Sequence, residues 1–357
     1  MSNCFGRTKL LGLVAAAGLL ASACGGGSTA SPTPSVAASA TVAPGTLPKP
    51  EVTTLRIGIS APTEPVQYAE KLADQLGFYK ELGFTSVTIT GFEGDGKALQ
   101  ALVAGQLDFF VGGASTAIST QLTDTPVKVV AVNSVLNTDG LYCKASIKTK
   151  EDVKGKAIAI STFGGTSHGS ALIAIGLIGY TSKDVVIKEV GNEGTRIAAL
   201  RGGSIDCIMA GLANDDTLKA VGANLIVDVT KGGQWGRSGL MARTEFMQKN
   251  PNTVLNVVAA AVRAQNYMWT NNADAAVKFA DWAQQKPDVA AAAVKAFLDY
   301  GLRSSIFTEE AFKAPQQVLA TVNPPVATVD LKKAYDLSFL QTLVDNGYYA
   351  KYGIPTK

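Results

Sequence analysis

The chain has 357 residues, with 32 Lys and Arg against 29 Asp and Glu and a formal net charge of +3. Basic and acidic residues are interspersed and form no basic stripe, which argues against a nucleic-acid partner. The apolar fraction of 46% is ample for sizeable cores. Beyond the N-terminal segment about 305 residues remain, a length that predicts two domains.

The N-terminus has the pattern of an export signal. Arg7 and Lys9 precede an apolar run from Leu10 to Leu20, and small residues lead to Cys24. The run is too short to span a bilayer, which needs roughly 20 apolar residues. We expect residues 1–24 to be a lipoprotein signal peptide, with Cys24 carrying a palmitate-type lipid. The alternative is ordinary cleavage beside an incidental cysteine.

Residues 25–52 consist mostly of Gly, Ser, Thr, Ala and Pro, with almost no large apolar side chain. Such a composition does not bury enough surface to fold by itself. We therefore expect a disordered tether between a membrane anchor and a folded body.

From residue 53 onward, short β-rich runs alternate with segments of helical spacing. This order predicts an α/β fold with two parallel-type sheets flanked by helices. Strands are expected at 55–60, 86–90, 107–111, 127–132, 157–161 and 225–229, with helices at 66–76, 98–103, 114–121 and 167–179. After Pro251 the pattern is almost all helical, with predicted helices at 252–270, 273–285, 287–301, 309–322 and 331–345.

One strand–helix–strand stretch occurs twice. Ser86 to Gly113 aligns without a gap to Asp184 to Gly211 at an offset of 98 positions, which matches Asp108 to Asp206. A repeated βαβ unit predicts two similar lobes. Any α/β protein repeats such elements, but the shared Ala-Leu-x-x-Gly-x-Leu/Ile-Asp core favours a true repeat.

The order of elements implies that the chain crosses between the lobes twice. Crossings are expected near 137–140 and 236–239, so that residues 53–138 with 240–357 form lobe 1 and residues 139–239 form lobe 2. Two linking strands permit hinge motion around a cleft. Cys143 and Cys207 both lie in predicted strands of lobe 2, and the sequence leaves open whether they form a disulfide or stay as buried thiols.

Several features, in order, resemble the solute-binding lipoproteins of ABC importers, in the subgroup for nitrate, sulfonate, taurine and thiamine-pyrimidine precursors. They are the strand LRIGIS, the helix ending Leu76-Gly77-Phe78-Tyr79, the Gly105-Gln106-Leu107-Asp108 run, Lys154-Gly155-Lys156 before AIAIS, and Gly164-Gly165-Thr166-Ser167-His168. The resemblance covers roughly residues 54 to 350 and implies the bilobal periplasmic-binding-protein fold (type II), with ligand between the lobes and neither catalysis nor a cofactor. It further implies a monomer that is anchored by lipid to the extracytoplasmic face of the membrane and works with an ABC permease.

Candidate ligand contacts lie where strands end. The glycines, hydroxyls and helix N-terminus that follow strand 157–161 suit an anion, and a similar turn follows strand 107–111. Asn214 and Asp215 would suit an amine, and Trp235 could stack on a planar ligand. The candidates are Ser60, Thr63, Glu64, Gly113, Ser115, Thr116, Asn133, Ser161, Thr162, Gly164, Gly165, Thr166, Ser167, Asn214, Asp215 and Trp235.

Each candidate also has a plain structural interpretation. The two Gly-rich turns could be simple helix caps, Glu64 could be solvated, and Trp235 could anchor a surface loop. For Arg196 and Arg201 we expect a solvated helix face, and for His168, the only histidine, a hydrogen bond at a helix start. No catalytic or metal-ligating residue is assigned.

The solute is expected to be a small anion or zwitterion of the sulfonate, nitrate, taurine or pyrimidine-precursor class. A ligand-sensing lipoprotein for a signalling partner would use the same cleft. An enzyme is the third class: one relative of this fold makes thiamine pyrimidine with its own histidine and a cysteine cluster. This chain lacks that cluster, as well as the Gly-x-Ser-x-Gly and Walker A motifs.

Overall fold

The computed structural model describes residues 43–356. The predicted signal peptide, Cys24 and the first part of the predicted tether lie outside the described residues. Among the described residues, no helix combines the length and the apolarity that crossing a bilayer requires.

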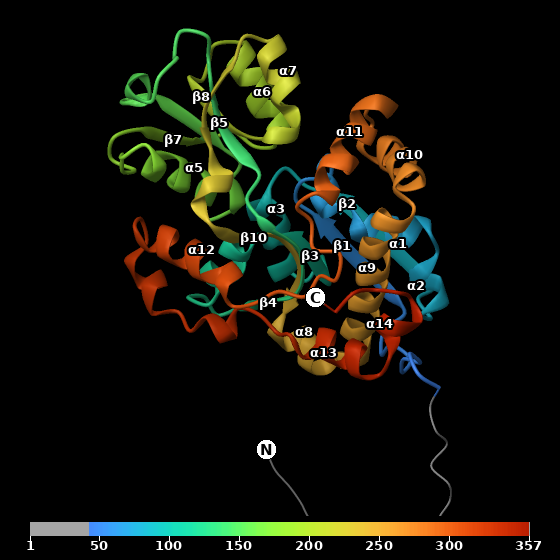
Figure 1. Cartoon of the computed structure of the whole chain (residues 1–357). Helices are drawn as coiled ribbons and strands as arrows, with labels where there is room; N and C mark the ends of the chain where they lie inside the picture. The colour runs from blue at the N-terminus through green and yellow to red at the C-terminus, as the bar shows by residue number, and fades with distance from the viewer. Residues whose placement is uncertain (1–42, 357) are drawn as a thin grey trace, which may run out of the picture. The chain divides into compact units, whose positions relative to one another are not determined.

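The first sheet has five strands in the order β2-β1-β3-β10-β4 (Figure 1). They are β1 (Thr54–Ile59), β2 (Ser86–Gly91), β3 (Phe109–Gly112), β4 (Val127–Leu136) and β10 (Gln234–Arg243). β1 runs parallel to β2 and β3, whereas β10 is antiparallel to β3 and β4. We call these strands, with the helices that pack on them, the first lobe.

The second sheet has the order β7-β6-β8-β5-β9. Its strands are β5 (Asp139–Cys143), β6 (Ala157–Ile160), β7 (Val186–Glu189), β8 (Cys207–Gly211) and β9 (Asn224–Asp228). β6 is parallel to β7 and β8, and β5 is antiparallel to β8 and β9. These strands and the helices α5 to α7 form the second lobe. The predicted α/β class is confirmed, and both sheets are mixed.

In both lobes, helices follow strands along the chain, as predicted. The helices are α1 (Ala69–Gln75), α2 (Phe78–Glu81), α3 (Asp95–Val103), α4 (Ala114–Thr120), α5 (Thr166–Leu177), α6 (Glu193–Arg201), α7 (Asp215–Ala220), α8 (Thr244–Lys249), α9 (Pro251–Thr270), α10 (Asn272–Ala283), α11 (Pro287–Leu298), α12 (Glu310–Ala320), α13 (Ser338–Asp345) and α14 (Tyr348–Lys351). Short 3₁₀ turns are η1 (Pro65–Gln67), η2 (Glu151–Val153), η3 (Leu212–Asn214), η4 (Val229–Gly232), η5 (Pro324–Thr328) and η6 (Leu331–Lys333).

The repeat predicted from the sequence is present in the structure. Helices α3 and α6 begin 98 positions apart and end 98 positions apart, and each is followed by the central strand of its sheet. Asp95 and Glu193 are therefore equivalent residues at the first position of their helices. This equivalence places one carboxylate on each lobe at the same structural position.

Two predictions about the chain's ends need correction. The expected helix 331–345 is divided, because Val129 of β4 exchanges backbone hydrogen bonds with Ala334 and Asp336 and holds this segment extended. The Asp336 side chain then accepts from the amide of Ser338, where α13 begins.

The last residues of the expected disordered tether are bound to the first lobe. The Glu51 carboxylate accepts from the amides of Asn252 and Thr253 at the start of α9, and the Pro48 carbonyl accepts from Asn256. The unpaired amides of a helix N-terminus attract a carboxylate, so this segment is held by polar contacts that its composition does not reveal.

The chain crosses between the lobes through β4–β5 and through β10. Trp235, near the start of β10, is fully buried and belongs to the apolar core of the second lobe, whereas Leu240 to Ala242 belong to the core of the first. The crossing therefore lies within the first half of β10. The domain boundaries given above remain a prediction. Cys143 and Cys207 form a disulfide between β5 and β8.

Candidate functional site

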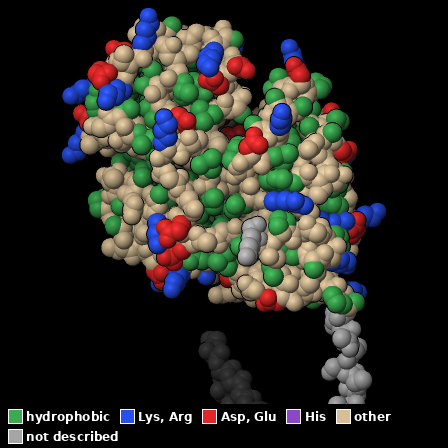
Figure 2. All heavy atoms as spheres, viewed as in Figure 1, with side chains coloured by type: hydrophobic (Ala, Val, Ile, Leu, Met, Phe, Trp, Pro, Cys, Tyr) green, Lys and Arg blue, Asp and Glu red, His purple; other side chains and the backbone are tan. Residues whose placement is uncertain are grey.

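A cavity of about 420 Å³ lies between the two lobes. Its volume is in the range of small-molecule sites in proteins. The walls come from the loops after β1 and β6, the N-termini of α3, α5 and α6, and the crossing strands. Figure 2 shows a hollow between the second lobe and the helices α10 and α11.

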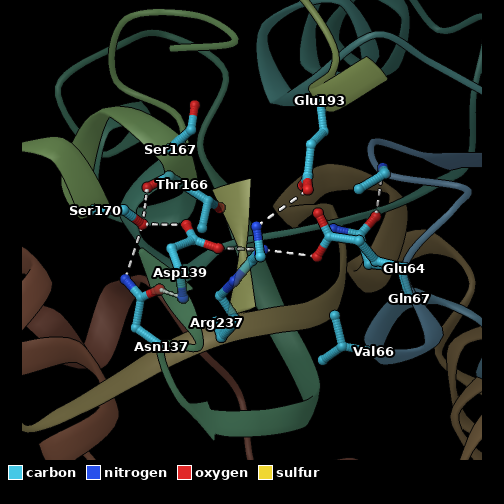
Figure 3. A network of polar contacts seen from close by, with 12 residues as sticks. Glu64, Val66, Gln67, Asn137, Asp139, Thr166, Ser167, Ser170, Glu193 and Arg237 are labelled. Carbon is cyan, nitrogen blue, oxygen red and sulfur yellow. Dashed lines mark hydrogen bonds and ion pairs between the residues drawn. The ribbon is translucent and has the colours of Figure 1, made fainter. Parts of the chain in front are cut away.

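Arg237 lines this cavity and lies at the centre of a polar network (Figure 3). Its Nη2 is 2.7 Å from Glu64 Oε2 and 3.1 Å from Asp139 Oδ1. Ser170 donates to Asp139 Oδ2 at 2.5 Å. Burial works against the charged guanidinium, but the carboxylates of Asp139 and Glu64 outweigh it and raise the pKa of Arg237. The two crossing segments are thus joined by a buried ion pair.

Glu193 enters the cavity from the N-terminus of α6. Its Oε1 accepts from the Gly211 amide at 3.1 Å and from Asn214 Nδ2 at 2.5 Å. Burial raises the pKa of Glu193 to about 7, and the negative charge of Glu64 raises it further. Burial also raises the pKa of Glu64, although Arg237 opposes that shift. Two acids from different lobes therefore repel each other across the cavity.

Arg196 contradicts the prediction of a solvated helix face. It is 5% exposed and lines the cavity. Its Nε donates to the Met209 carbonyl at 2.9 Å and its Nη1 donates to the Gly191 carbonyl at 2.6 Å. Burial lowers its pKa. Arg201, on the same helix, is exposed as expected.

The Gly-rich turn before α5 already holds a carboxylate of the protein itself. Asp95 Oδ2 accepts from the Thr166 amide at 2.8 Å, from Thr166 Oγ1 at 2.8 Å and from Thr116 Oγ1 at 3.1 Å. A helix N-terminus favours negative charge, and here Asp95 of the first lobe supplies it to a helix of the second.

The predicted site residues fall into two groups. Those that line the cavity are Ser60, Thr63, Glu64, Ser161, Thr166, Ser167 and Asn214, whereas Gly113, Ser115, Thr116, Asn133, Thr162, Gly164, Gly165, Asp215 and Trp235 lie outside its wall.

Members of the second group have structural contacts instead. Trp235 is buried in the second-lobe core, where no solute reaches its ring to stack on it. Asn133 donates to the Val66 carbonyl, and Asp215 accepts from Tyr142 and pairs with Lys219. A Cβ at Gly113 would lie 2.0 Å from Thr166 Oγ1, so glycine there permits the close approach of the lobes.

The charged residues of the cavity were mostly missed. Asp95, Asp139, Glu193, Arg196 and Arg237 all line it. Two signals could have found some of them. Asp139 and Arg237 lie within the predicted crossings, and Asp95 and Glu193 are acids at matching positions of the repeat.

His168 behaves as expected of a histidine at a helix start. Its Nδ1 accepts from the Gly164 amide at 3.1 Å, and burial lowers its pKa.

Comparison with known proteins decides the family. The model of the family described as "NMT1/THI5 like" matches residues 68–275, more than half of the chain. The chain belongs to this NMT1/THI5-like family. A protein of Brucella abortus (strain 2308), named as a candidate binding protein, is 26% identical over 211 residues, which are 56% of this chain and 62% of the relative. The chain thus aligns to less than two thirds of that relative's length.

Solved structures show the same fold. A protein from Bordetella bronchiseptica RB50 is 25% identical with a TM-score of 0.74, covering 86% of this chain and all (100%) of that one. The alkanesulfonate-binding protein SsuA from Xanthomonas axonopodis pv. citri, bound to MOPS, is 19% identical with a TM-score of 0.67, over 80% of this chain and 99% of that one. This NMT1/THI5-like protein therefore has the periplasmic-binding-protein fold, and the resemblance drawn from its sequence is confirmed.

Proposed function

We propose that this protein is the extracytoplasmic solute-binding component of an ABC importer. The observation that carries the proposal is the cavity itself, which is lined by polar and charged side chains from both lobes and from the two strands that join them. Such a position allows a solute to contact both lobes at once. Family membership and the sulfonate-binding neighbour support the same function.

The proposed mechanism is capture by hinge closure. A solute that contacts both lobes binds the closed form more tightly than the open form, and only that difference in affinity shifts the equilibrium toward closure. The closed form then presents a surface for the permease. Within this proposal the protein is a monomer held at the membrane by a lipid on Cys24.

The proposed solute is a small anion or zwitterion of the sulfonate, nitrate, taurine-like or pyrimidine-precursor class. Binding is tested by thermal unfolding of the purified protein with each class of solute. A true ligand present at about 100 times its Kd stabilises the folded state by roughly 2.7 kcal/mol.

The same preparation separates binding from the rival functions. Mass spectrometry of the solute after incubation detects turnover, and chemical conversion would replace the proposal by an enzyme. A solute that binds but is not imported by cells, while a signalling output depends on it, would indicate the sensor instead.

A further inference from the structure

The charge of the cavity points to a narrower class of solute. We propose that the solute carries a protonated nitrogen, held between Glu64 of the first lobe and Glu193 of the second, together with an oxygen acceptor that faces Arg237. This inference rests on the proposed function and specifies the solute of the same site.

The cavity holds more acid than base. Four carboxyl groups line it, from Glu64, Asp95, Asp139 and Glu193, against two guanidinium groups, from Arg196 and Arg237. Buried charges are stable only when they are paired and hydrogen-bonded. An excess of carboxylate in an enclosed site therefore favours a cation from outside the chain.

Hydrogen bonding among the described residues leaves three of these acids with one oxygen that accepts no bond. Asp95 accepts three hydrogen bonds from threonines, all through Oδ2, whereas both oxygens of Asp139 are bound, by Arg237 and Ser170. Glu193 accepts only through Oε1, and Glu64 accepts only through Oε2, within the part of the chain that the structure describes. One glutamate oxygen on each lobe, Oε1 of Glu64 and Oε2 of Glu193, thus remains for an ammonium group, which has three donors.

Neither arginine donates a hydrogen bond to Glu193 among the described residues, although the charge of Arg196 lowers the pKa of Glu193 against the effects of burial and Glu64. Arg196 directs Nε and Nη1 to the backbone carbonyls of Met209 and Gly191. Arg237 directs Nη2 to Glu64 and Asp139. A cation between Glu64 and Glu193 would relieve their repulsion and link the lobes, which is what solute-driven closure requires.

Arg237 provides a second observation, which concerns hydrogen-bond donors and not the excess of acids. It is 5% exposed and lines the cavity, and among residues 43–356 only its Nη2 donates hydrogen bonds: Nε is buried without a partner, and Nη1 has none either. A guanidinium with unused donors in an enclosed polar site calls for an oxygen acceptor. The solute therefore has two unlike poles.

The position where a simple anion would be expected to bind is already occupied by a side chain of the protein. Asp95 occupies the N-terminus of α5, where sulfonate or nitrate would gain most from the backbone amides. In addition, none of the described residues that line the cavity is aromatic, so the wall favours an aliphatic solute over one that must stack.

The test uses matched pairs of solutes that differ only in a nitrogen. Taurine is compared with isethionate and β-alanine with 3-hydroxypropionate, within a series of such pairs that extends to the size of the cavity; nitrate is added as a simple anion. Affinities for the full chain are measured by isothermal titration calorimetry. We expect the nitrogen-bearing member of a binding pair to bind about tenfold more tightly or better than its hydroxyl partner.

The result separates this inference from the proposed function. Equal or tighter binding of isethionate, 3-hydroxypropionate or nitrate would overturn the inference and leave solute capture intact. Failure of every solute in the series to bind would overturn both.

Variants of the two glutamates test whether their carboxylates hold the nitrogen of the solute. Glu193→Gln keeps an acceptor for Asn214 and Gly211 but removes the charge, so the nitrogen-bearing solute should bind roughly tenfold more weakly while anion binding is unchanged or improved. Glu64→Gln provides the same test from the other lobe. Glu151→Gln, an exposed acid of the second lobe outside the cavity, is the matched control. Full affinity in both Glu193→Gln and Glu64→Gln would refute the assignment.

Discussion

Glu70 is a carboxylic acid enclosed in the core of the first lobe. It is 0% exposed on α1, and both carboxylate oxygens lack a hydrogen-bond partner among the described residues. Burial raises its pKa from 4.5 to about 7. Burial, together with the negative charge of Glu70, also raises the pKa of Tyr79.

This burial makes stability depend on pH. Because the pKa of Glu70 is higher in the folded state, the folded protein binds more protons between pH 4.5 and about 7. The free energy of unfolding therefore falls as the pH rises through this window, and this one group accounts for about 3 kcal/mol of the loss.

We predict that Glu70→Gln removes this loss. The variant should be more stable than the wild type by about 2–3 kcal/mol at about pH 8, with little difference at about pH 5. Urea unfolding at both pH values measures it. A stability difference that does not change with pH would show that Glu70 is not the titrating group.

At the scale of elements, the disulfide cross-links two neighbouring strands of the second sheet. Cys143 of β5 and Cys207 of β8 are direct register partners, 64 residues apart in the chain. A cross-link that closes so long a loop limits the unfolded chain more than the folded one. The cross-link therefore stabilises the folded second lobe relative to its unfolded chain.

We predict that reduction destabilises the protein by roughly 2–4 kcal/mol. The measurement is urea unfolding with and without reductant, and the Cys143→Ala/Cys207→Ala double variant serves as the control that reductant should not affect. An unchanged unfolding midpoint of the wild type on reduction would contradict the expectation.

At the scale of the whole molecule, Asp95 makes hydrogen bonds that join the two lobes beside the cavity. It lies on α3 of the first lobe and binds the amide and hydroxyl of Thr166 on α5 of the second. A second bond runs from the Gly96 amide to Thr162 Oγ1 at 3.1 Å. These bonds join the two lobes directly, side chain to backbone and side chain to side chain.

We predict that Asp95→Ala shifts the solute-free protein toward the open form. Hydrogen bonds to a charged group contribute about 1.5–3 kcal/mol each, enough to change which form dominates. Small-angle X-ray scattering should show a larger radius of gyration than for the wild type. Asp124→Ala, at an exposed acid of the same lobe, should leave it unchanged. If both variants scatter as the wild type does, Asp95 does not hold the lobes together.

Seven of the twenty residues that line the cavity were predicted from the sequence, because they lie at strand ends and helix starts. Ser60, Glu64, Ser161 and Thr166 follow strands or begin helices, and the ends of parallel strands gather at one edge of a sheet. Trp235 was misassigned because its glycine neighbours indicate a loop, whereas β10 carries it into a core.

The sequence by itself determined the α/β class, the doubled βαβ unit and the loops that meet between two lobes, because apolar periodicity and glycine positions are local properties of the chain. Only the tertiary structure decided which charges face one another. Glu64, Glu193 and Arg237 lie far apart along the chain, and their pairing, burial and repulsion depend on distances that folding alone sets. The character of the cavity, which is more acidic than the Gly- and Ser-rich turns indicated, follows from those distances.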